Sequence, residues 1–210
     1  MSRPDPRITW ATTCIFGDSI AEGAGDETGQ GWADLLKADW KIPRPQHSGN
    51  PASSGYPNIY NLGIDGDRVI DVLNRFDIEA AARKARDVVV SIGANDLTWA
   101  DDRPVTGLVT FTRQYDELLA LATSEGRRVL CINLLRVDES GSHGVRNVEV
   151  DQFNAAIADL VRRHQVELLD IAHLLTPADF VDGIHPNHSG AQKLYQAVKA
   201  KLTQLDWGKL

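Results

Sequence analysis

The fold class follows from one stretch of the sequence, Asp87-Val88-Val89-Val90-Ser91-Ile92, which predicts a buried strand. A short β-branched run with no polar alternation is typical of a strand covered on both faces, as in a parallel sheet. Outward from this run, strand-like segments alternate with stretches of helical spacing along the whole chain. The expected strands are residues 12–16, 58–62, 87–92, 129–135 and 166–171. The expected helices are the stretch with Trp32, Leu35, Leu36 and Trp40 on one face, then 68–83, 107–124, 148–164 and 189–205. This alternation predicts an α/β fold, with a parallel sheet covered by helices on both faces and right-handed crossovers.

The composition predicts one fairly large globular domain over residues 1–210. Hydrophobic residues make up 42% of the chain and charged residues 24%, which is close to ordinary globular usage. The formal net charge of −7 disfavours nucleic acid and anionic membranes as partners, because both would repel an acidic protein. We therefore expect neither partner, and the sequence leaves the oligomeric state open.

Cys14 and Cys131 are the only cysteines, and each lies within an apolar, strand-like run. This placement favours two buried thiols of a reducing compartment over a disulfide or a metal site. Residues 1–7 carry two prolines and an acid, and the short apolar run that follows breaks at Gly17. That pattern predicts neither a signal peptide nor a membrane span, so we expect a cytoplasmic protein. The segment 41–57 is rich in Pro, Ser, Gly and Asn, and it is expected to be a long loop at the opposite edge of the sheet from the candidate site.

Four short blocks carry groups that acyl transfer through serine would need. The first, Gly17-Asp18-Ser19-Ile20, supplies a hydroxyl, and the last, Asp182-Gly183-Ile184-His185-Pro186, supplies a carboxylate three residues before an imidazole. Between them, Asn61-Leu62-Gly63 offers a backbone amide at a glycine, and Gly93-Ala94-Asn95-Asp96 offers a side-chain amide. One such block alone would indicate little, whereas four in order across most of the chain form a strong pattern.

These blocks assign a role to each of five residues. Ser19 is the expected nucleophile, and His185 is the expected general base, held in the required tautomer by Asp182. The oxyanion of the tetrahedral intermediate would be bound by the amides of Ser19 and Gly63 and by the side chain of Asn95.

The predicted topology brings these five residues to one place. Ser19 follows the first strand, Gly63 closes the second and Asn95 follows the third, while Asp182 and His185 come after the fifth. In an open α/β sheet, ligands bind at the carboxyl ends of the strands. Residues chosen for their chemistry therefore fall on the edge of the sheet that binds ligands, which scattered loop residues would not do.

Each of these residues also has an ordinary structural reading. Ser19 could be a plain helix N-cap, Gly63 a strand-ending glycine and Asn95 a turn former. Position 21 is Ala, so the Gly-x-Ser-x-Gly elbow of α/β-hydrolases is absent. His185 is distinguished from the other histidines by an acid three residues earlier and by the proline that follows it. The other histidines are His47, His143, His164, His173 and His188.

The blocks resemble those of the GDSL-type, or SGNH, hydrolases, a family named for a Ser, a Gly, an Asn and a His carried in four blocks. Ser19, Gly63, Asn95 and His185 match these four residues one for one, and Asp182 matches the acid before the histidine.

The resemblance covers residues 14–194, with Ile20 where the name-giving motif has Leu. It implies a three-layer α/β/α fold of flavodoxin-like topology with about five parallel strands. It also implies a mechanism without cofactor or metal: Ser19 attacks an ester carbonyl, an acyl-enzyme forms, and water activated by His185 releases the acid.

The resemblance implies an ester substrate, but the sequence says little about which ester. Loops 22–30, 97–105 and 136–147 lie on the active edge and are Gly-rich, acidic or polar, with Trp99 as the one large aromatic residue. This composition favours small soluble esters, with acyl groups from acetyl to roughly hexanoyl, O-acetyl sugars included. We expect Trp99, His143 and the 136–147 loop to contact the substrate.

Two other classes of function remain open. Acyl transfer to an acceptor alcohol, or action on lysophospholipids or thioesters, would use the same residues. A flavodoxin-like module that binds a phosphate or nucleotide is the non-enzyme alternative, supported by the Gly-rich run at 22–25. Neither a P-loop nor a G-x-G-x-x-G fingerprint follows the first strand, which counts against that alternative.

Overall fold

Five parallel strands form one sheet in the computed structural model, which describes residues 12–40, 58–100, 103–142 and 144–207. Neighbouring strands pair in the order β2-β1-β3-β6-β7, all of them parallel. This is the strand order of flavodoxin-like sheets. The direction in which successive strands are added to the sheet changes between β1 and β3. The strands are β1 (Thr12–Gly17), β2 (Asn58–Gly63), β3 (Asp87–Ser91), β6 (Arg128–Ile132) and β7 (Glu167–Leu169).

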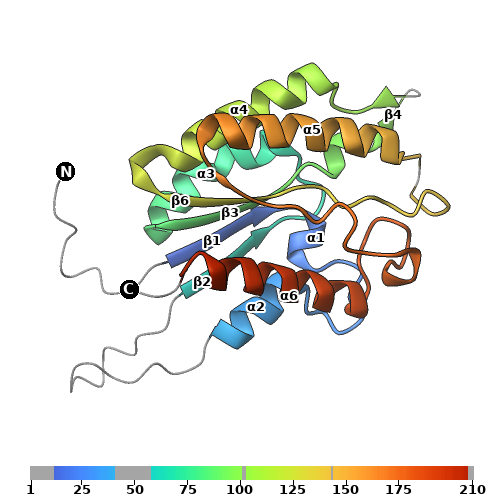
Figure 1. Ribbon diagram of the computed structural model, residues 1–210, viewed down its shortest axis with the longest axis horizontal. Helices are drawn as coiled ribbons and strands as arrows, with labels where there is room; N and C mark the ends of the chain where they lie inside the picture. The colour runs from blue at the N-terminus through green and yellow to red at the C-terminus, as the bar shows by residue number, and fades with distance from the viewer. Residues whose placement is uncertain (1–11, 41–57, 101–102, 143, 208–210) are drawn as a thin grey trace.

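Helices cover both faces of the sheet, as Figure 1 shows. On one face lie α3 (Val69–Arg83), α4 (Leu108–Thr123) and α5 (Asn147–His164). On the other lie α2 (Trp32–Trp40) and α6 (His188–Gln204). The expected three-layer α/β/α architecture with a parallel sheet of five strands is therefore confirmed. Among the described helices, none combines the length and the apolar character that a membrane crossing needs.

The central strand shows why the sequence folds in this way. Val88 and Val90 point into the core beneath α3, α4 and α5, whereas Val89 points into the core beneath α2 and α6. All three side chains are completely buried, so an uninterrupted apolar run satisfies both faces of the sheet. On the opposite layer, Trp32 and Leu36 of α2 are buried as the helical spacing predicts.

Two strands are shorter than their apolar runs predict. The expected strand 129–135 ends at Ile132, and the expected strand 166–171 is confined to Glu167–Leu169. Beyond β6 the Asn133 amide still donates to the Leu169 oxygen at 3.2 Å, and its side chain makes the next contacts, with Oδ1 accepting from the Ile171 amide at 2.7 Å and Nδ2 donating to Asp170 at 2.8 Å. The regular ladder ends here, although the Arg136 amide still donates to the Ala172 oxygen at 3.1 Å.

Several short elements lie outside the sequence prediction. They are α1 (Ser19–Glu22), the antiparallel pair β4 (Trp99–Ala100) and β5 (Arg103–Pro104), and the 3₁₀ turns η1 (Asn95–Leu97), η2 (Ser124–Gly126) and η3 (Pro177–Asp179). The predicted long loop at 41–57 lies outside the described residues, as does the side chain of Trp40.

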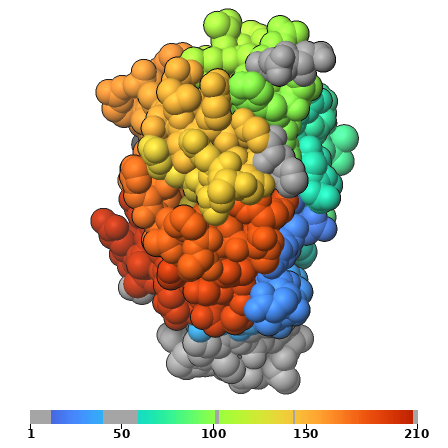
Figure 2. Space-filling view, turned by 90° about the vertical axis from the view of Figure 1, so that its right-hand side faces the viewer, coloured from blue at the N-terminus to red at the C-terminus, as the bar shows by residue number. Residues whose placement is uncertain are grey.

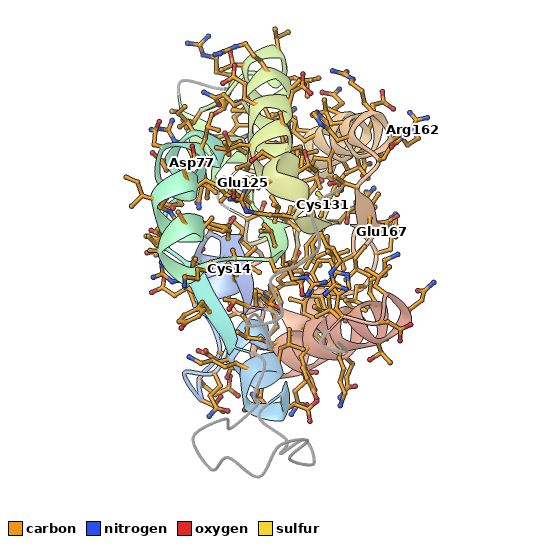
Figure 3. The ribbon with its side chains drawn as sticks, turned by 90° about the vertical axis from the view of Figure 1, so that its left-hand side faces the viewer. Cys14, Asp77, Glu125, Cys131, Arg162 and Glu167 are labelled. Carbon is orange, nitrogen blue, oxygen red and sulfur yellow. The ribbon has the colours of Figure 1, made fainter. Side chains whose placement is uncertain are left out.

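Both cysteines are free and buried, which confirms the sequence-based prediction. Cys14 is on β1 and Cys131 on β6, with β3 between them, and Figure 3 labels both. Burial raises the pKa of each thiol to about 12, so both stay protonated at neutral pH.

Candidate active site

Ser19 lies at the start of α1, directly after β1, and is 3% exposed. Its Oγ is 3.0 Å from Nε2 of His185, 166 residues further along the chain. Asp18 caps the helix, since its carboxylate accepts a hydrogen bond from the Ile20 amide at 3.0 Å. The cap fixes the turn that points the serine hydroxyl toward the imidazole.

The imidazole of His185 is oriented by Asp182. Oδ2 of Asp182 is 2.7 Å from Nδ1, and Oδ1 accepts from the backbone amides of His185 and Ile184 at 2.8 and 3.0 Å. Burial acts to raise the pKa of Asp182, but the hydrogen bonds from His185 and Ile184 outweigh it, so the pKa lies below its usual value. Because this carboxylate only accepts, Nδ1 carries the proton and Nε2 is left with a lone pair facing Ser19.

The turn that carries His185 is held from behind by Asp179. This buried carboxylate accepts from Lys193 at 2.7 Å and from both the amide and the hydroxyl of Thr176, at 2.9 and 2.8 Å. Burial acts to raise the pKa of Asp179, but the lysine and the threonine together lower it to about 2. The backbone oxygen of Asp179 also accepts from the Asn187 amide at 2.8 Å, which closes the turn around the histidine.

Asn95 begins η1, just beyond the end of β3, and lines the same cavity as Ser19 and His185. One hydrogen of its Nδ2 group is donated to the backbone oxygen of Asp67, at 3.0 Å. Since an amide nitrogen carries two hydrogens, this bond anchors the side chain and leaves a second donor. Asn95 is therefore placed where the sequence predicts it, beside the nucleophile.

Gly63 closes β2, but it is not among the residues that line the cavity. Its amide donates to Oδ1 of Asn61 at 3.1 Å. A Cβ atom at this position would lie 2.4 Å from the Glu22 nitrogen and 2.8 Å from the Asp18 oxygen. The missing side chain thus lets the end of β2 pack directly on α1, a contribution that the sequence analysis did not anticipate.

Arg75 on α3 is a positioning residue that the sequence analysis missed. Its guanidinium donates to the Leu62 oxygen at 2.7 Å and to the carboxylate of Asp67 at 2.9 Å. Since the Asp67 backbone oxygen accepts from Asn95, the arginine fixes the segment that anchors the amide. A single Arg in a helix gives no sequence signal for this role, because its partners come from two other segments.

Asp18 is the second group that the sequence analysis did not assign. Its carboxylate is buried beside Ser19, and it accepts from the amides of both Ile20 and Ala94. Burial raises the pKa of Asp18 to about 6, against the opposing effect of these hydrogen bonds and of the nearby His185. Asp18 ties the first block to the third, because Ala94 immediately precedes Asn95.

A cavity of about 170 Å³ opens beside the serine and the histidine. Ser19, His185, Asn95 and Asp18 are among its polar lining residues. Most of the remaining wall is aliphatic and comes from several separate parts of the chain, including Ile92, Leu97, Leu134, Val137, Val145 and Val150. The site therefore has a small reactive polar patch next to a larger apolar wall.

The 136–147 loop lies against the turn that carries the histidine. The Asp138 amide donates to the Gly183 oxygen at 2.9 Å, and a Cβ on Gly141 would lie 2.8 Å from the Asp182 oxygen. Figure 2 views the molecule from this edge, where the yellow surface of the loop adjoins the orange surface of residues 172–187. Among the described residues of this loop, Val137 and Val145 line the cavity.

The two predicted substrate contacts have different outcomes. Trp99 is not among the residues that line the cavity; the Arg146 guanidinium lies 4.5 Å from its ring centre, and a Cβ on Gly144 would touch it at 3.4 Å. His143 lies outside the described residues. Trp99 therefore supports the loop from behind, and the structure does not bring it to the reactive groups.

Two other histidines lie close to carboxylates, but neither presents a base to a hydroxyl in the way that His185 does. His164 contacts Asp116 at 2.6 Å on the surface. His188 has Nδ1 3.1 Å from Asp26 and Nε2 2.8 Å from the Gln192 amide. Among the described residues, there is also no group of three or more His, Cys, Asp or Glu that could hold a metal ion.

Comparison with known proteins places this arrangement in a family. The model of the GDSL-like lipase/acylhydrolase family matches residues 15–193, a span that includes all four blocks. The comparison with curated proteins finds no matching relative.

Solved structures with the same fold include a lipase/acylhydrolase from Enterococcus faecalis, with 22% identity, a TM-score of 0.72, and coverage of 93% of this chain and 96% of that one. An alpha/beta hydrolase from the metagenome of Lake Arreo has 22% identity and a TM-score of 0.72, covering 94% and 99%. An acetylxylan esterase from Geobacillus stearothermophilus has 18% identity and a TM-score of 0.72, covering 91% and 94%. The chain belongs to the GDSL-like lipase/acylhydrolase family and is a carboxylic ester hydrolase.

Proposed function

We propose that Ser19, His185 and Asp182 form a catalytic triad that hydrolyses carboxylic esters through an acyl-enzyme. The observation that carries the proposal is the continuous chain of contacts from Ser19 Oγ to His185 Nε2 at 3.0 Å and from His185 Nδ1 to Asp182 at 2.7 Å. Both distances are short enough for proton transfer and for orientation of the base.

The reaction then has two halves, acylation of Ser19 and hydrolysis of the acyl-enzyme. Ser19 Oγ attacks the ester carbonyl carbon while its proton passes to His185 Nε2, and the departing alcohol takes this proton as the carbon–oxygen bond breaks. In the second half, water gives a proton to His185 and attacks the acyl-enzyme. Ser19 recovers the proton as the acid is released.

The developing oxyanion would be bound by the second Nδ2 hydrogen of Asn95 and by the amide of Ser19. Ser19 lies in the first turn of a helix, where amides lack intrahelical acceptors. Gly63 joins these donors when its amide exchanges the Asn61 oxygen for the oxyanion. We propose short-chain or O-acetyl esters as the substrate class.

The test is hydrolysis of p-nitrophenyl acetate by the wild type and by Ser19→Ala, together with mass spectrometry after treatment with a fluorophosphonate. We expect activity to fall by a factor of about a thousand or more in the variant, and one phosphonyl adduct to form on wild-type Ser19 only. The exposed serine at position 124 provides the control, and Ser124→Ala should match the wild type. Hydrolysis that survives Ser19→Ala would overturn the proposal.

We also propose that residues 1–210 form a single catalytic domain in the cytoplasm. The five-stranded sheet with one core cluster on each face supports the first statement, and two buried free thiols support the second. Limited proteolysis that releases a second stable fragment would contradict the first, and recovery of the protein outside the cytoplasmic fraction would contradict the second.

A further inference from the structure

We propose that the cavity beside Ser19 is a binding site for a saturated acyl chain of about six carbons, and that Val145 and Val150 set the length it accepts. The inference rests on the proposed function, since it assumes that Ser19 becomes acylated. Beyond that function, the inference states that the protein selects the acyl part of the substrate and names the residues that select it.

The chemistry of the wall favours a hydrocarbon over a sugar. Among the described residues, the other polar side chains that line the cavity are Ser91, Thr98 and Asn133, and the last two already have partners. Thr98 donates to the Asn95 oxygen at 2.8 Å, and Asn133 is bound to Asp170 and to the Ile171 amide. Because Thr98 and Asn133 are already hydrogen-bonded within the protein, the cavity offers a hydroxylated ligand few hydrogen bonds. These would not replace the hydrogen bonds that the ligand makes to water.

The size of the cavity sets the length of the chain. An apolar cavity of about 150 Å³ accommodates benzene, a ligand of six carbon atoms. The cavity here measures about 170 Å³, so a chain of similar carbon number fills it. An acetyl group would leave most of the aliphatic wall without contacts. Each buried methylene improves binding by roughly fourfold, so hexanoyl should exceed acetyl by on the order of a hundredfold in kcat/KM.

The order of the two reaction halves assigns this cavity to the acyl group. The alcohol leaves in the first half and needs an open path, whereas the acyl group stays attached to Ser19 until water arrives. A site that surrounds the chain next to the nucleophile holds the covalent intermediate in place. The alcohol then lies toward solvent, where its structure affects the rate less.

Val145, in the loop before α5, and Val150, on α5, are two of the aliphatic residues that line the cavity, and the contacts around them hold this part of the wall in place. Both side chains are buried, at 4% and 0% exposure. The carbonyl of Val145 accepts from the buried Ser142 hydroxyl at 2.6 Å. At the ends of the loop, the Asn147 side chain pairs with both backbone groups of Val137, at 2.8 and 3.0 Å. A wall fixed in this way can discriminate between chain lengths.

The experiment measures kcat/KM for p-nitrophenyl esters from acetate to decanoate with the wild type, Val145→Phe and Val145→Ala. We expect a wild-type optimum near hexanoate. Val145→Phe should lower the ratio of the hexanoate to the acetate kcat/KM at least tenfold, while Val145→Ala should move the optimum to longer chains. Val148→Phe on α5 is the matched control, because Val148 is 56% exposed and does not line the cavity.

The outcomes separate this inference from the proposed function. Ser19-dependent hydrolysis with acetate as the best substrate, or a profile that neither Val145 variant shifts, overturns the acyl site while the triad stands. A chain-length dependence found with alkyl acetates, in place of acyl esters, also overturns it. Absence of hydrolysis for every ester, with no phosphonate labelling of Ser19, refutes the proposed function itself. Val145→Ala keeps the test decisive if Val145→Phe fails to fold.

Discussion

Gly25 lies directly behind His185, and a Cβ atom on the glycine would be 2.8 Å from the Cβ of the histidine. The same atom would be 2.9 Å from the Pro186 oxygen, and the glycine has a positive φ of 90°. Side chains other than hydrogen are strained at that φ and have no room at that contact. The imidazole of His185 is therefore supported from behind by a residue that has no side chain of its own.

Gly25→Ala is expected to reduce kcat by up to about a hundredfold, because a shift of about 1 Å in a catalytic group is enough to do so. Gly29→Ala is the matched control, since Gly29 also has a positive φ, of 68°, but nothing lies within 4 Å of its missing Cβ. Steady-state kinetics of both variants, with far-UV circular dichroism to confirm folding, provide the measurement. Equal losses in the two variants would show that backbone strain, and not contact with His185, is responsible.

Arg75→Lys is expected to lower kcat by roughly tenfold or more with little change in KM. Lysine cannot reproduce the fork that binds the Leu62 oxygen and Asp67 together, so Asn95 loses its fixed anchor. Arg83→Lys in the same helix is the control, because Arg83 contacts Glu79 and does not reach the site. If the two variants had the same kcat, Arg75 would have only a structural role.

Asp18→Asn is expected to become more stable relative to the wild type as the pH rises. Burial raises the pKa of Asp18 from 3.8 to about 6, so the folded protein holds a proton that the unfolded chain releases between these values. The stability of the wild type is therefore lost as the pH rises through this window, by about 2 kcal/mol between pH 4 and pH 7. Urea denaturation of both proteins at these two pH values tests the sign. A difference that does not change with pH would contradict the assignment.

Asp179→Asn is expected to behave in the opposite way. The pKa of Asp179 is lowered to about 2, so its ionised form stabilises the folded protein above pH 4, and this stability is lost as the pH falls through the folded pKa. The variant should be less stable than the wild type by about 2 kcal/mol at pH 7, and the gap should narrow by about 1 kcal/mol at pH 3. Urea denaturation at these pH values is again the measurement. A gap that widens on acidification would refute the prediction.

The strands, the long helices and the pairing of Asp182 with His185 could be predicted because their signals are local. Val88 to Val90 form a continuous apolar run, and Asp182 lies three residues before His185. The end of β6 could not be predicted, since the side chain of Asn133 takes up the next contacts through partners on the segment after β7. Apolar periodicity alone therefore gave strands that were too long.

Positions that depend on the folded arrangement were missed. Arg75 reaches Asn95 only through the Asp67 segment, and Trp99 turned out to support the 136–147 loop instead of lining the cavity. The apolar wall of the cavity was also unexpected, because the loops around it are polar in composition. Val137 and Val145 line the cavity, whereas the polar residues of the same loop that the structure describes do not.

The hydrogen bond from the Asp138 amide to the Gly183 oxygen joins the loop that walls the cavity to the turn that carries the base. Gly183 has a positive φ of 84°, and a Cβ there would lie 2.5 Å from the Asp138 oxygen, so the two segments touch through their main chains. Insertions or deletions in the loop would therefore disturb the imidazole as well as the wall. A change in loop length would therefore alter substrate preference and turnover at the same time. Directed evolution toward a new ester should recover point substitutions in the wall earlier than changes in loop length.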